Sequence, residues 1–127
     1  MEEAMIKEIL SKKRQYEAEF RFLSSLADED NCSLLNDALA EKRNLEMLLK
    51  RIDLWLALLS EDEVFVITRH LIDGIDVPRI VLEYERKWGG EFGKTERTIK
   101  MYQSRALKKI AEFESKHDWL QKISLSV

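Results

Sequence analysis

The chain of 127 residues suits one compact domain, or a small domain with a helical extension, and is too short for two separate cores. Charged residues make up 35% and hydrophobic residues 45%, which is typical of soluble helical proteins rather than disordered chains. Four Gly and one Pro argue against a turn-rich β fold, and no apolar run reaches the roughly 20 residues that span a bilayer. We therefore expect an all-α, cytoplasmic protein with no membrane partner and, with Cys32 alone, no disulfide or thiolate metal cluster.

Two long helices are predicted before residue 60. Apolar residues near one face predict the first helix over residues 3–26: Met5, Ile9, Tyr16, Phe20 and Leu23. After a polar turn, apolar residues at steps of three and four predict the second over residues 34–59: Leu45, Leu48, Ile52, Leu56 and Leu59. Their similar lengths and short connection predict an antiparallel hairpin.

Further apolar residues of the second helix lie outside that stripe: Leu49, Leu54, Trp55 and Leu58. A helix that is apolar around much of its circumference contacts more than one neighbour. Either the second helix packs on the C-terminal part of its own chain, or it pairs with a second copy, and both contacts are compatible.

Two shorter helices are predicted next. Ser60 and Glu63 form an S-x-x-E capping box, so a helix should begin there, and Gly74 is suited to end it. Asp76 can cap the following helix, which continues to about Trp88 before a Gly-rich stretch interrupts it.

The most informative segment is KTERTIKMYQSRALKKI, residues 94–110. Thr95 is the predicted N-cap, and nothing breaks the helix before Phe113. Its inner stripe recurs at steps of three and four: Ile99, Tyr102, Ala106, Ile110 and Phe113. Most of the remaining circumference is cationic, as in a DNA recognition helix.

Charge is distributed unevenly along the chain. Residues 86–109 contain eight Lys or Arg against two acids, a charge of +6, so the rest carries −9 in a chain whose net charge is −3. An acidic body with one basic stripe can bind a polyanion in a defined orientation. The alternative is a surface helix whose charges are merely solvated.

Residues 60–110 resemble the region 4 helix-turn-helix of the sigma-70 family. The strongest match is TERTIKMYQSRALKKI over residues 95–110, and LSEDEVFVITRHLIDGID over residues 59–76 resembles the preceding family helix and turn. By size and layout, the whole chain is similar to small phage-encoded late transcription regulators of the ArpU and RinA type.

The resemblance implies three parts: a long helical hairpin over residues 1–59 for packing or oligomerisation, a helix-turn-helix DNA-binding domain over 60–113, and a short extension over 114–127. One feature departs from region 4, because about eight extra residues lie between Tyr84 and Thr95. They either lengthen the supporting helix by two turns or form a small loop that contacts the DNA backbone beside the groove, so the fold is expected to have a lengthened turn.

The resemblance also implies how DNA is contacted, because helix-turn-helix proteins read bases with the first turns of the recognition helix. The predicted base-reading residues are Glu96, Arg97, Lys100 and Met101. The predicted DNA-backbone contacts are Lys94, Thr95, Ser104, Arg105 and Lys108. For Arg105 and Lys108, the alternative is an intramolecular salt bridge.

Nothing in the sequence predicts an enzyme, a metal site or a cofactor. His70 and His117 are isolated, and GGEFG lacks the Lys-Ser/Thr of a phosphate-binding loop. We predict a sequence-specific regulator of transcription that binds double-stranded DNA and is derived from a phage or prophage. RNA polymerase and a second copy, paired through the N-terminal helices, are further predicted partners. The alternatives are a helical, anti-sigma-like adaptor that binds an acidic protein surface, and a small terminase-like packaging subunit.

Overall fold

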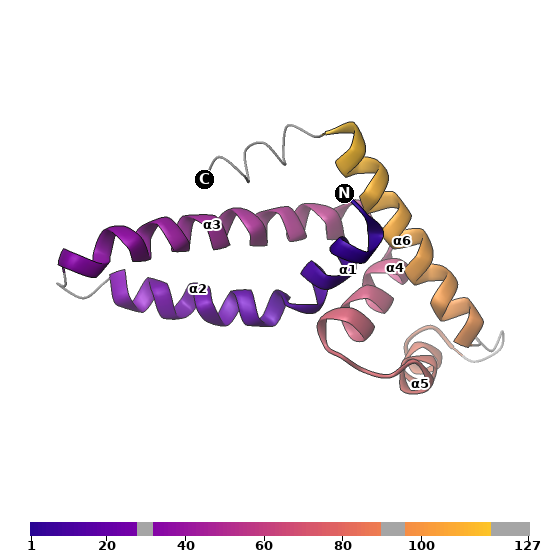
Figure 1. The fold of residues 1–127 in the computed structure, drawn as a ribbon. Coiled ribbons are helices and arrows are strands. Elements are labelled where there is room, and N and C mark those ends of the chain that lie inside the picture. The colour runs from indigo at the N-terminus through magenta and orange to yellow at the C-terminus, as the bar shows by residue number, and fades with distance from the viewer. Residues whose placement is uncertain (28–31, 90–95, 118–127) are drawn as a thin grey trace.

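The computed structural model describes residues 1–27, 32–89 and 96–117, apart from the side chains of residues 27 and 32–35, and all regular structure in these ranges is helical, as predicted (Figure 1). The elements are α1 (Glu3–Ser11), α2 (Lys13–Ala27), α3 (Cys32–Ala57), α4 (Glu61–Ile67), the π-helical turn η1 (Thr68–Ile72), α5 (Val77–Trp88) and α6 (Glu96–Lys116). None of these helices has the length and apolar character needed to cross a membrane.

The helices α2 and α3 pack along each other as the predicted antiparallel hairpin, which extends away from α6 (Figure 1). The prediction of one continuous helix over residues 3–26 is wrong. At Lys12 the backbone leaves the helical conformation (φ −100°, ψ 4°), and α1 turns to pack on α6 and η1. This turn buries Ile6 and Leu10 completely, whereas Met5, expected on the inner face, is 52% exposed.

A first apolar cluster joins α1, α3, the end of α4, η1 and α6. Its buried members are Ile6, Leu10, Ile52, Trp55, Ile67, Leu71, Ile72, Ala106, Leu107 and Ile110. Residues before and after position 60 therefore share one core. Trp55, which lies outside the predicted stripe of the second helix, is fully buried in this core, so α3 does contact the C-terminal part of its own chain.

A second apolar cluster joins α4, α5 and α6, and its buried members are Val66, Ile80, Tyr84, Ile99 and Tyr102.

The predicted capping box begins α4: the Ser60 hydroxyl accepts from the Glu63 amide at 3.3 Å, and the Glu63 carboxylate accepts from the Ser60 amide at 2.9 Å. Gly74 has φ 72° and follows η1, as expected for a residue that ends a helix. Asp76 holds the N-cap position of α5, but its side chain accepts no capping hydrogen bond.

A buried ionic contact fastens the C-terminal half of α6 to α3. The Glu114 side chain is fully buried, and the Arg51 guanidinium donates to both of its oxygens, at 2.6 Å from Nε and 2.7 Å from Nη2. The indole Nε1 of Trp55 donates to the same carboxylate at 2.5 Å. Both carboxylate oxygens therefore have a donor, which offsets the cost of removing the charge from water.

Replacing Glu114 with Gln or Ala should strongly destabilise the protein, because it removes the carboxylate that the buried Arg51 guanidinium and Trp55 indole contact. We expect the free energy of unfolding in urea to fall by about 3 to 5 kcal/mol. The control is Glu112→Gln, an exposed carboxylate on the same helix, which should change it by less than about 0.5 kcal/mol. Equal effects of the two substitutions would show that the buried contact does not hold α6 in place.

Candidate nucleic-acid interface

The inner side of α6 is core, as predicted. Ile99, Tyr102, Ala106 and Ile110 are buried, and Phe113 is half-buried. The N-terminal half of α6 packs in the cluster with α4 and α5, while its C-terminal half packs in the cluster with α1 and α3. The helix is thus supported on one side along its length, and its other side faces solvent (Figure 1).

That outer side carries most of the predicted DNA-contacting residues. Glu96, Arg97, Lys100, Met101, Ser104, Arg105 and Lys108 are all exposed. At 3.6 residues per turn, Arg97, Met101 and Lys108 fall on one stripe that is about 16 Å long. Met101 is an apolar residue 43% exposed among these cations. Lys94 and Thr95 lie outside the described residues.

We call Arg97, Lys100, Arg105 and Lys108 the cationic face. None of these four side chains forms a salt bridge with any residue that the structure describes. The predicted alternative for Arg105 and Lys108, an intramolecular ion pair, is therefore not seen within these ranges. Their charges stay solvated and open to an anionic partner.

Other cations of the same region are engaged elsewhere. Lys109, also on α6, donates from Nζ to Glu63 at 2.6 Å. The Lys87 ammonium lies 5.4 Å from the ring centroid of Phe65 and 4.6 Å from that of Trp88. These two positive charges were counted in the basic segment, yet neither joins the cationic face.

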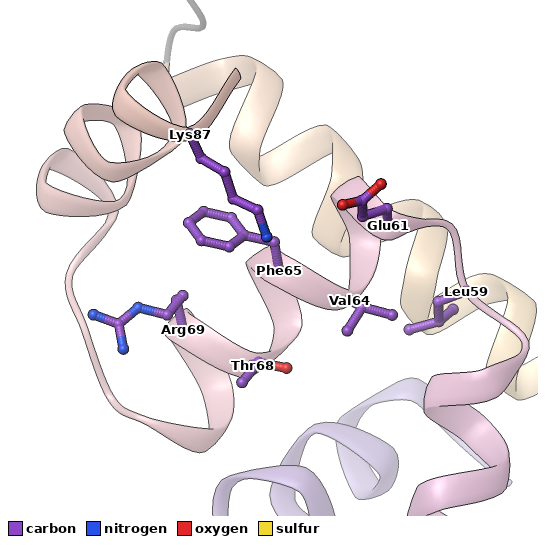
Figure 2. Close-up of a pocket in the computed structure, with 7 residues that line it drawn as sticks. All are labelled: Leu59, Glu61, Val64, Phe65, Thr68, Arg69 and Lys87. Atoms are coloured by element: carbon purple, nitrogen blue, oxygen red, sulfur yellow. The ribbon is translucent and has the colours of Figure 1, made fainter. Parts of the chain in front are cut away.

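Lys87 reaches over a shallow pocket between α4 and α5 with a volume of about 400 Å³ (Figure 2). Leu59, Val64 and Phe65 supply its apolar lining. On α4, Val64 and Phe65 turn away from the side that carries Glu63 and Val66, which meets α6. The pocket therefore opens on the side of α4 opposite to α6.

A surface ionic network fixes α5 against η1 and α2. Arg69 donates to both oxygens of Glu83, at 2.8 and 2.7 Å, and to Asp73 at 2.9 Å. Asp73 also accepts from Arg14 of α2. The hydrogen bonds from Arg69 lower the pKa of Glu83, although partial burial opposes this effect. These arginines neutralise carboxylates of the same chain, so they do not extend the cationic face.

Glu63 links the beginning of α4 to α6. Burial alone would raise the pKa of its carboxyl group, but the hydrogen bonds from Lys109 and Ser60 outweigh this and lower the pKa below 4.5. The carboxylate is thus held ionised by two elements at once. The contact also draws Lys109 toward the core while its neighbour Lys108 stays exposed.

No family model, curated protein or solved structure matches this chain. Within the described ranges, no three His, Cys, Asp or Glu side chains are grouped so that they could hold a metal ion. The cationic face of α6 is the candidate site that the geometry supports best.

Glu63→Gln should remove a pH-dependent contribution to stability. Since the folded-state pKa of Glu63 lies below its ordinary value of 4.5, the contribution is present above that pH and is lost as the pH falls through the folded-state pKa. In urea unfolding at pH 7, we expect the variant to be less stable by about 1 to 3 kcal/mol. The difference should shrink toward pH 3. Glu61→Gln, an exposed acid in the same helical turn, is the control, and a difference independent of pH would contradict the assignment.

Proposed function

We propose that the protein is a sequence-specific regulator of transcription, derived from a phage or prophage, that binds double-stranded DNA. In this proposal, α5 and α6 are the supporting and recognition helices of a helix-turn-helix like that of sigma region 4. The observation that carries it is the cationic face: four exposed cations on a helix that is buried only on its opposite side, with no salt bridge to a described residue.

The major groove of B-DNA, about 12 Å wide, admits one α-helix. With the first turns of α6 in the groove, Arg97 can donate two hydrogen bonds to a guanine, and Glu96 can accept one from a cytosine amino group. Lys100 faces base edges, and Met101 meets a thymine methyl group. Specificity then comes from the beginning of the helix.

Residues farther along α6 contact the DNA backbone. Ser104, Arg105 and Lys108 lie about two to three turns beyond Arg97, where the groove gives way to phosphates. Lys94 and Thr95, which precede the helix, are proposed backbone contacts as well. These groups supply affinity and register, and they do so for any sequence.

The connection between the two helices is longer than the three or four residues usual in helix-turn-helix proteins. The supporting helix α5 continues one turn beyond Tyr84 to Trp88, and Gly89 follows with φ 91°. Residues 89–95 then join it to α6. Part of the extra length therefore extends α5 by one turn, whereas the sequence predicted either two turns or a small loop.

The charge distribution supports a single mode of approach, because DNA is attracted to the basic segment and repelled by a remainder that carries −9. The pocket beneath Lys87 opens on the other side of α4. A regulator bound to DNA through α6 would thus keep that side accessible to RNA polymerase, the second proposed partner.

Arg97→Ala should relax sequence preference and cost roughly 1 to 3 kcal/mol on the cognate duplex, because a base contact is lost. Lys108→Ala should weaken cognate and random duplexes alike. Fluorescence anisotropy with duplexes from the DNA neighbouring the coding region, and with a random duplex of equal length, measures both effects. Arg21→Ala, an exposed cation on α2, is the control and should bind as the wild type does. Equal losses on both duplexes for Arg97→Ala and Lys108→Ala would remove the base-reading assignment.

Binding should weaken steeply as salt increases. If the proposed backbone cations Lys94, Arg105 and Lys108 neutralise about three phosphates, the logarithm of the association constant should fall with the logarithm of salt concentration with a slope near −3. The same titration on Lys108→Ala should give a slope smaller by about one. A flat response between low and physiological salt would favour the adaptor role, in which α6 binds a protein.

A further inference from the structure

The side of α3 that faces away from its buried Ile52 and Trp55 carries three rows of residues at seven-residue spacing. Residues seven apart nearly superpose along a helix, so each row runs parallel to the axis. The rows are Ala40, Met47 and Leu54; Arg43, Lys50 and Ala57; and Leu39, Glu46 and Asp53. Met47 is half-buried and the other eight are exposed, with Leu39 and Leu54 at 41% and 40%. We call these nine residues the outer face of α3.

We propose that the outer face of α3 binds a second copy of the chain, with the two α3 helices antiparallel and a twofold axis near residues 47 and 48. In an antiparallel pair centred there, two residues lie opposite each other when their residue numbers sum to about 95. Arg43 then faces Asp53 of the second copy, and Lys50 faces its Glu46.

The apolar residues match in the same register. Met47 meets Met47 of the second copy on the axis, while Leu54 packs on Ala40, and Leu39 packs on Ala57. Each apolar side chain is thus buried against another apolar side chain, and each charged side chain lies opposite one of the opposite charge. A parallel arrangement in register would instead place every charge beside an identical charge.

The order of charges is what selects a second copy as the occupant. Along the helix, the charges at residues 43, 46, 50 and 53 are positive, negative, positive and negative. A second α3 running in the opposite direction therefore places an opposite charge beside each of them. Lys50 and Glu46 lie 3.3 Å apart within the chain, but their side chains are 74% and 47% exposed, so both can also reach across an interface.

The outer face is compatible with DNA binding by α6. Trp55, which holds Glu114 of α6, lies to one side of the outer face of α3, and α6 contacts α3 with its inner side, opposite to the cationic face. A second copy on the outer face therefore leaves both cationic faces uncovered. Each dimer would present two copies of α6, as a repeated DNA site requires.

The experiment is analytical ultracentrifugation of the full chain without DNA over a wide concentration range. The wild type should show a reversible equilibrium between monomer and dimer. Arg43→Asp and Asp53→Arg should each raise the dimer dissociation constant roughly tenfold or more, since each places like charges opposite one another twice per dimer. The double variant Arg43→Asp/Asp53→Arg should restore it to within about threefold, because the exchanged pair is attractive again.

The rescue separates an interface from an intrachain effect. Arg43 and Asp53 lie about 15 Å apart along one helix, so they cannot meet within a chain. Arg21→Asp on α2 is the matched control and should leave the dissociation constant unchanged, and circular dichroism should show that every variant keeps its helices. A chain that is monomeric at all concentrations, or a double variant as weak as the single ones, would overturn the proposal. Since no DNA is present, the outcome is independent of the proposed DNA binding.

Discussion

The carboxylate of Glu114 determines how α6 is presented. The helix is 21 residues long, and the cluster with α4 and α5 covers only its first turns, so its direction depends on what holds the far end. Arg51 and Trp55 of α3 hold that end by hydrogen bonds to a carboxylate that has no access to water. A buried charge tolerates little displacement, because losing a partner leaves an uncompensated ion. The contact therefore fixes the helix more narrowly than apolar packing alone does.

Two groups of cations in the described part of the chain differ in what they contact. Arg51, Arg69 and Lys109 each neutralise a carboxylate of another element and so connect helices. The cationic face has no such carboxylate among the described residues, and its four side chains point to solvent. The division explains why composition alone overstates the basic surface: in the segment with a formal charge of +6, Lys109 and Lys87 serve contacts inside the fold.

Local signals in the sequence predicted much of this fold. The capping box of Ser60 and Glu63, the inner stripe of α6 and the helix-ending Gly74 each depend on residues a few positions apart, and the structure has all three. No Gly or Pro marks the interruption of the helix at Lys12. The turn buries Ile6 and Leu10 against residues far along the chain, so local sequence did not predict it. Glu114 did carry a signal, as an acid in line with Leu107 and Ile110 on the buried side of α6. Its meaning depended on Arg51 and Trp55, which are about 60 residues away in sequence.

The same long-range contacts relate the two proposals to each other. The inner side of α3 holds α6 through Glu114, and its outer face offers self-complementary charges to a second copy. A helix fixed on both sides would hold two recognition helices at a constant separation, because little freedom remains between them. A single recognition helix gains little affinity from one half-site, whereas a rigid pair makes the second contact nearly intramolecular. The spacing of DNA half-sites would then be set by α3 and its contacts, and their sequence by the first turns of α6.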